Sequence, residues 1–264
     1  MLFRSLVFPD TATGPNTWAP VTIDGNIDLA SAQAPRTRRW FRVAASPATA
    51  TTADLMDTTR AGVVVNANIA GAGGLAQSGQ GKLILAGDNS YSGDTIVNEG
   101  VLQVQSNTAL GSAAQGTTVE WGGALMIVGE LDTAAEPLLL ASGGTDGVPA
   151  FFYAPANDAD PAQTLTYNGP LTINYPTPLT ASRAIDSLNV TGAITLNAPL
   201  TVGANNDSVT LGGPITSGPL GWVPGLLEGR FIGTSSMITS IMDESFPNSG
   251  TGGVKLAPEA AETA

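Results

Sequence analysis

Short runs that alternate apolar and polar residues recur along the chain from about residue 61 onward. Each run has three or four residues, and most place apolar side chains at positions i and i+2, on one face of an extended strand. The sequence therefore predicts many very short β-strands. They lie at residues 63–65, 82–85, 95–97, 102–104, 117–119, 125–127, 165–167, 171–173, 188–190, 194–196, 200–202 and 209–211.

The spacing of these runs predicts how they pack. Strands this short are unstable in a free-standing hairpin but gain stability when many of them stack in register. The intervals from Leu83 to Leu102 and from Leu102 to Leu125 are both roughly 20 residues, which fits one coil of a β-solenoid. In such a coil the chain turns three corners and returns one layer higher. We therefore predict an all-β fold, a right-handed single-stranded parallel β-helix with irregular ends, in which these three leucines form one interior ladder.

A β-sandwich is the alternative fold, but the composition suits it less well. Sandwiches use longer strands and a core with more aromatic residues. Here aromatic residues make up 6% of the chain and hydrophobic residues 42%. The 32 glycines and 18 prolines also indicate frequent tight turns. Thin coils filled by small side chains satisfy both observations.

Charge and residue types exclude several function classes. The net charge is −12, and residues 61–264 hold four basic and seventeen acidic residues, so we expect no nucleic-acid partner. The chain has no Cys and no His, which removes thiol and imidazole catalysis and the common zinc sites. No apolar stretch approaches the ~20 residues of a transmembrane helix.

A basic cluster with aromatic neighbours lies in the part of the chain that precedes residue 61. Basic residues beside aromatic ones can bind nucleic acid by stacking, but we favour an edge strand whose charges block further pairing. The cluster consists of Arg36, Arg38, Arg39, Trp40, Phe41 and Arg42.

One stretch, Gly74 to Val104, follows a more specific pattern in which glycines punctuate alternating apolar residues. Its matching positions are Gly79, Gly81, Leu83, Leu85, Gly87, Asn89, Tyr91, Ser92, Gly93, Thr95, Val97, Gly100 and Leu102. This stretch resembles the autotransporter-associated β-strand repeat, also called the passenger-associated transport repeat. The resemblance implies a secreted or surface-exposed bacterial passenger, whose repeats are thought to assist folding and export.

The same positions have structural interpretations that need no family. We expect alternating residues such as Leu83 and Leu85 to point inward. Glycines in this stretch should occupy corners that need a positive φ. Asn89 should hold a corner by bonding its own backbone or stacking on another Asn. Tyr91 should cap a corner with its hydroxyl in water. The glycines concerned are Gly81, Gly87, Gly93 and Gly100.

We expect three segments: an irregular or β segment at 1–60, the β-helix at 61–212 with the repeat at 74–104, and a C-terminal segment at 213–264. Pro214, Pro219 and Pro224 interrupt the pattern in the last segment, which we interpret as the start of another module. We expect the chain to be a fragment of a longer protein, with its signal and anchor outside it.

Candidate chemistry is sparse. Asp88, Asp94 and Glu99 lie near Lys82 in sequence, but acidic residues at glycine-rich corners are typically solvated. Asp158 and Asp160 form an Asp-x-Asp pair that lacks the further ligands of a calcium loop. Residues 71–74 do not continue into the calcium-binding nonapeptide of other β-helices.

We therefore expect no catalytic, cofactor-binding or metal-binding residues and no cofactor. The leading hypothesis is a non-catalytic, passenger-like β-helix outside the cell or on the bacterial outer surface, which serves adhesion or surface structure. Its expected partners are surface glycans or other proteins. The alternative is an extracellular carbohydrate-active enzyme on the same fold, which would need several carboxylates and a basic residue converging on one groove.

Overall fold

The structure is a computed structural model that describes most of the chain between residues 20 and 217. The described residues are 5–8, 20–29, 38–45, 52–58, 62–129, 131, 135–156, 161–181, 186–202, 208–217, 227–229 and 255–256. Asp158, Asp160 and Arg36 lie outside them. So does almost all of the segment that begins at residue 218.

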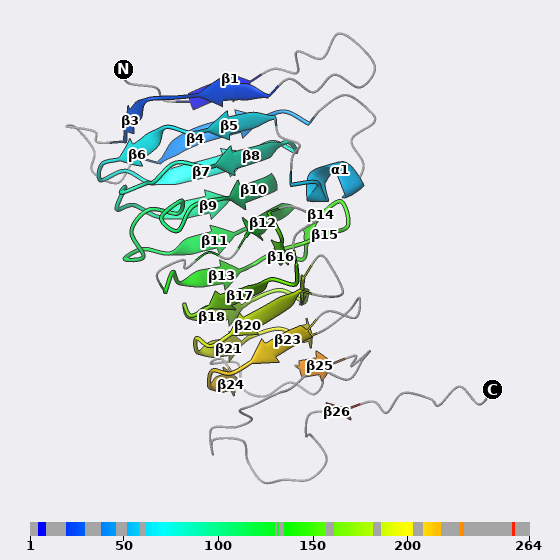
Figure 1. Ribbon diagram of the computed structural model, residues 1–264. Helices are drawn as coiled ribbons and strands as arrows, with labels where there is room; N and C mark the ends of the chain where they lie inside the picture. Colours follow the sequence, from blue (N-terminus) through cyan, green and yellow to red (C-terminus); the bar gives the residue numbers. More distant parts are fainter. Residues whose placement is uncertain are drawn as a thin grey trace.

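Most of the described strands belong to two long parallel sheets (Figure 1). The nine-stranded sheet runs, in spatial order, β1 (Ser5–Phe8), β4 (Arg39–Val43), β7 (Leu75–Ser78), β9 (Thr95–Val97), β11 (Thr117–Val119), β13 (Leu138–Leu140), β18 (Leu171–Ile173), β21 (Ile194–Leu196) and β24 (Ile215–Ser217). The ten-stranded sheet runs β2 (Val21–Ile23), β5 (Val63–Val65), β8 (Lys82–Leu85), β10 (Gly100–Val104), β12 (Gly123–Val128), β16 (Phe151–Ala154), β19 (Thr177–Ala181), β22 (Leu200–Val202), β25 (Leu227–Gly229) and β26 (Lys255–Leu256).

A third side closes each coil. Near the first described coils it is formed by β3 (Asn26–Asp28) paired with β6 (Asn68–Ala70), and further along by loops. From residue 164 it is a parallel three-stranded sheet of β17 (Thr164–Tyr167), β20 (Ser187–Val190) and β23 (Ser208–Leu211). The chain visits the three sides in turn, so the coils follow one another in sequence order down the stack (Figure 1).

The predicted interior ladder is confirmed. Leu102 pairs in register with Leu83 on one side and with Leu125 on the other, and none of the three side chains is exposed. The ladder continues to Val63 and to Phe151 in the neighbouring strands. The parallel β-solenoid predicted from the sequence is therefore confirmed, whereas the right-handed sense of its coil stays a prediction.

The two long sheets continue across the segment boundaries expected near residues 60 and 212. Strand β4 pairs with β1 and with β7, and β24 pairs with β21. The interpretation of Arg39–Val43 as an edge strand is therefore wrong, because both of its edges carry a hydrogen-bonded neighbour. The division of the chain into three functional segments remains a proposal.

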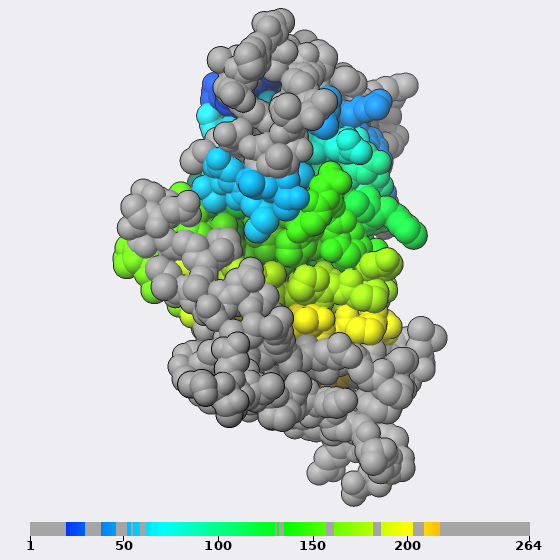
Figure 2. Space-filling model, turned by 90° about the vertical axis from the view of Figure 1, so that its right-hand side faces the viewer, coloured from blue at the N-terminus to red at the C-terminus, as the bar shows by residue number. Residues whose placement is uncertain are grey.

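A second apolar cluster lies outside the coils, on the outer face of the ten-stranded sheet. Leu55 of α1 (Thr52–Met56) packs there against Val101, Met126 and Phe152, all of them buried. The antiparallel hairpin of β14 (Gly144–Thr145) and β15 (Val148–Pro149) contributes Val148 to the same cluster. Figure 2 shows the helix (light blue) directly beside green residues of the middle coils. This cover explains why all six residues of β12 are buried.

Hydrogen bonds to several coils hold in place the segment that contains α1. Lys82 Nζ donates to the carbonyl oxygen of Asp57, and Gln103 Nε2 donates to that of Thr58 at 2.9 Å. Thr52 Oγ1 donates to the carbonyl oxygen of Asp146 in the hairpin. These contacts involve successive levels of the stack, so the segment 52–58 joins parts of the chain that are distant in sequence.

The glycines of the repeat have two different structural roles. Gly100 has φ of +72°, as expected for a corner that requires glycine. Gly81, Gly87 and Gly93 do not lie in the left-handed region, so the expected reason for glycine was wrong there. At Gly87 a Cβ atom would lie 2.2 Å from the carbonyl oxygen of Ala67. Glycine is required there because adjacent coils approach too closely for a side chain.

The interior ladder predicts that Leu102→Ala destabilises the coil stack. The substitution removes a fully buried side chain between two close-packed layers, which costs about 2–5 kcal/mol. Urea unfolding followed by circular dichroism measures the loss. Thr201→Ala, at an exposed position of β22, is the matched control and should change stability by less than about 0.5 kcal/mol. Equal effects of the two substitutions would contradict the ladder.

The close approach of two coils at Gly87 predicts that Gly87→Ala lowers stability more than Gly122→Ala, which introduces only backbone strain. Gly122 has φ of +72° and open space around it, so Gly122→Ala should cost about 1–2 kcal/mol. Gly87→Ala must separate two coils and should lower the urea midpoint further. A Gly87→Ala protein as stable as the unsubstituted chain would show that the coils can relax apart freely.

Candidate functional site

The repeat between residues 75 and 104 places polar side chains inside the stack. Asn89 is 5% exposed and bonds to the coils on either side of its own. Its Oδ1 accepts from the backbone N–H of Ile69 at 2.8 Å, and its Nδ2 donates to the carbonyl oxygen of Ala109 at 2.6 Å. The expectation that Asn89 bonds its own backbone or another Asn was therefore wrong. It joins three layers instead.

Tyr91 also lies inside the stack, so the expected wet hydroxyl is another wrong prediction. The residue has no exposed surface, and its hydroxyl lies 2.6 Å from Thr95 Oγ1. Burial raises the pKa of Tyr91. Gly111 allows the ring to fit, because a Cβ there would lie 3.0 Å from Tyr91 Cδ2. Both Asn89 and Tyr91 therefore stabilise the stack.

The acidic residues named as candidate chemistry have separate structural partners. Asp94 pairs with Arg38, whose Nε donates to Asp94 Oδ1 at 3.0 Å, and this hydrogen bond raises the pKa of Arg38. Glu99 Oε2 accepts from the backbone N–H of Gly79 at 3.1 Å. Asp88 Oδ1 accepts from Thr108 Oγ1 at 3.3 Å.

These contacts hold the three acidic side chains at different parts of the coil, and Lys82 lies elsewhere again. Lys82 is 3% exposed, on the outer face of the ten-stranded sheet beneath residues 57–58. No group of three or more acidic residues that could hold a metal ion occurs among the described residues. The same part of the chain contains no helix with the length and hydropathy of a membrane span.

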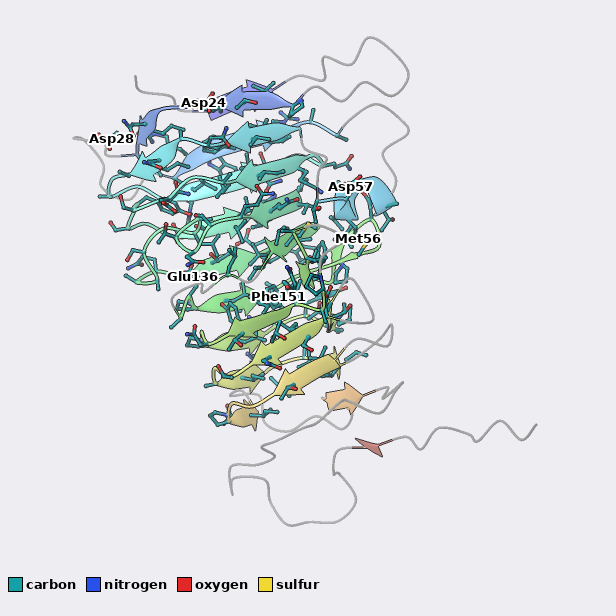
Figure 3. All side chains as sticks on the ribbon, viewed as in Figure 1. Asp24, Asp28, Met56, Asp57, Glu136 and Phe151 are labelled. Carbon is teal, nitrogen blue, oxygen red and sulfur yellow. The ribbon has the colours of Figure 1, made fainter. Side chains whose placement is uncertain are left out.

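Glu136 is a buried acid that the sequence did not single out. It is 2% exposed, its Oε1 accepts from Thr117 Oγ1 at 2.9 Å, and its carbonyl oxygen accepts from the Tyr167 hydroxyl. Burial raises the pKa of Glu136 to about 7, and the Thr117 hydrogen bond opposes that shift. In Figure 3 Glu136 lies on the side of the stack away from Met56 and Asp57. Because it is enclosed by protein, it is unsuited to act on a polymeric substrate.

The exposed corner between the nine-stranded and ten-stranded sheets carries two aromatic residues. Trp121 is 79% exposed and Tyr175 is 48% exposed. Each follows the C-terminal end of a strand of the nine-stranded sheet, at the same corner of different coils. The sequence pattern did not predict this pair, because the two residues lie far apart in the chain. The Gly-Gly pair at 122–123, a sequence signal for a turn, directly follows Trp121.

The fold and the repeat together define a β-solenoid that carries a passenger-associated transport repeat. The family model of that repeat matches residues 75–104, which confirms the resemblance seen in the sequence. The chain is similar to the adhesin BmaC autotransporter of Brucella suis biovar 1 (strain 1330), with 42% identity over 67 residues. This region covers 25% of the chain and 2% of that adhesin, so the chain spans a small part of its relative's length. No solved structure is significantly similar to this chain.

The raised pKa of Glu136 predicts a pH-dependent contribution to stability. The folded-state pKa of about 7 exceeds the ordinary value of 4.5, so the folded state holds this proton more tightly. Stability from this group is therefore full below about pH 4.5, falls as the pH rises to 7, and stays low above it. Allowing for partial solvent screening, the loss is about 2 kcal/mol.

Glu136→Gln isolates this contribution, because other carboxyl groups titrate equally in both proteins. The amide keeps an acceptor for Thr117 without a charge. We expect the two proteins to unfold at similar urea concentrations at pH 4.5 and the Gln variant to be the more stable at pH 8. A stability difference that does not change with pH would contradict the raised pKa of Glu136.

Proposed function

We propose that this chain is a non-catalytic part of a bacterial surface passenger, which holds exposed corners away from the cell for adhesion. The observation that carries the proposal is the match of residues 75–104 to the passenger-associated transport repeat, on a chain that folds as a stack of coils. The similarity to an autotransporter adhesin supports the same function. The proposed location is extracellular, associated with the bacterial outer membrane.

The arrangement of charged groups supports a scaffold over an enzyme. Carbohydrate-active enzymes on such a fold need two carboxyl groups that face each other across a substrate. Asp88, Asp94 and Glu99 each have a separate partner, and Glu136 is enclosed by protein. We therefore propose that the coils provide length and rigidity and that surface glycans or proteins are bound at the outside.

Display on a cell surface tests this proposal. The chain is fused to the signal and translocator of an autotransporter and expressed in a non-adherent laboratory bacterium. We expect the displayed chain to resist limited proteolysis and to increase adherence of the bacteria to cultured host cells. The control is the same translocator with an unrelated β-helix passenger. Surface display without any gain in adherence would contradict the adhesive function.

The non-catalytic part of the proposal has its own measurement. The purified chain is incubated with bacterial and host polysaccharides, and newly formed reducing ends or unsaturated products are quantified. We expect no product above a heat-denatured sample. Product formation that is lost on Asp94→Asn or Glu99→Gln would instead favour the carbohydrate-active enzyme.

A further inference from the structure

Trp121 is held outward by a rigid turn. The backbone N–H of Gly123 donates to the carbonyl oxygen of Glu120 at 2.7 Å, and Gly122 has φ of +72°. This geometry places Trp121 at the second position of a β-turn, where almost any residue is accepted. The turn therefore needs glycine at 122 but does not need tryptophan at 121. A large apolar side chain that is 79% exposed has no packing role in the described coils.

Tyr175 lies at the same corner, two coils further along. Backbone hydrogen bonds define consecutive coils here, from Ala141 N to Val119 O and from Asn174 N to Leu140 O. Trp121 and Tyr175 thus stand in layers separated by one intermediate coil. With parallel strands about 4.8 Å apart, the two positions are about 10 Å apart along the stack. This distance is close to the length of a disaccharide unit.

The intermediate coil places Ser142 in register between the two rings, with its side chain buried. It has Gly143 at this corner, and a Cβ there would lie 3.1 Å from Tyr175 Cε1. The Tyr175 ring therefore lies close to the backbone of Gly143. The hairpin that starts at Gly144 packs toward β12 and β19 and leaves both rings exposed.

Polar groups flank the aromatic pair. Glu120 precedes Trp121 and is half-buried, and Asn174 precedes Tyr175 and is exposed. Asn174 Oδ1 accepts from Asn197 Nδ2 at 2.7 Å, which holds the Asn174 amide in place and uses none of its own N–H groups. A carboxylate and an amide beside aromatic faces can bond hydroxyl groups while the rings pack against C–H faces.

The charge around this corner selects against anionic ligands. Residues 83–182 contain no Lys or Arg and ten acidic residues. Arg38, whose charge interacts with Glu120, is paired with Asp94. Nucleic acids, sulfated glycans and anionic lipids would be repelled. A neutral polymer rich in hydroxyl groups meets no such penalty.

We propose that the corner formed by Trp121 and Tyr175 binds a neutral polysaccharide whose chain lies along the stacking direction, with sugar rings packed on the two aromatic side chains. This inference rests on the proposed adhesive function and names its ligand class. The contacts are few, so single sites bind weakly, and many copies on one cell provide avidity.

Glycan binding by the purified full chain tests the inference. The chain is applied to an array of neutral and sulfated glycans, and a neutral hexasaccharide that binds is then titrated by calorimetry. We expect Trp121→Ala and Tyr175→Ala each to weaken binding about tenfold or more, since aromatic anchors dominate such sites. Trp40→Ala is the matched control, because Trp40 is also exposed (38%) but lies on the nine-stranded sheet. It should leave the affinity unchanged.

Tryptophan fluorescence reports ligand contact with Trp121, because the emission would not respond to the glycan if Trp121 had only a structural role. Replacing Trp18, Trp40 and Trp222 by Phe leaves Trp121 as the single tryptophan. We expect the bound hexasaccharide to shift or quench its emission. Absence of neutral-glycan binding on the array would overturn the inference, as would binding that survives both alanine substitutions or that favours sulfated glycans.

Adherence of displaying bacteria separates this inference from the function on which it rests. If Trp121→Ala and Tyr175→Ala cells adhere as strongly as the parent, the adhesive function stands and the glycan site is wrong. If adherence to a protein-coated surface persists after glycans are removed enzymatically, the ligand is a protein and the inference is likewise overturned. Loss of adherence with both variants, and not with Trp40→Ala, supports it.

Discussion

In-register stacking of inward apolar side chains is the constraint on which the rest of the structure depends. A slip of one residue would turn Leu102 outward and break its pairing with Leu83 and Leu125. Strands as short as these cannot hold the register alone, so each coil relies on its neighbours. The same dependence extends to polar groups, since Asn89 finds its partners only in the coils before and after its own.

Because the inward side chains must stack in register, the coils differ from one another mainly at their corners and on their outer faces. One corner carries Trp121 and Tyr175, and in the intermediate coil the chain inserts the hairpin at 144–149, which packs toward β12 and β19. The hairpin and α1 cover part of the ten-stranded sheet and convert its outer face into a second apolar cluster. A solenoid of this kind can therefore keep one architecture while presenting different groups at each level. This property suits a surface passenger.

The sequence predicted the apolar interior ladder well, but it predicted neither the enclosure of Tyr91 nor the packing on the outer face. Alternation around Leu83 and Leu102 gives the inward face directly, because a strand has a period of two. The burial of Met126 and Phe152 on the outer face could not be predicted, since their cover comes from Leu55 and Val148 in distant segments. The role of Gly87 was misassigned for a similar reason. Its neighbour is the backbone of Ala67, one coil away.

The sequence by itself determined the coil length, the inward ladder, the repeat and the absence of thiol or imidazole chemistry. These properties depend on residue type and on spacing within one or two coils. The tertiary structure alone decided that Tyr91 and Glu136 are enclosed and that Trp121 and Tyr175 share a corner. Whether a side chain is enclosed, or meets another, depends on how many residues each intervening coil contains. Insertions such as the hairpin change that number without leaving a periodic signal in the sequence.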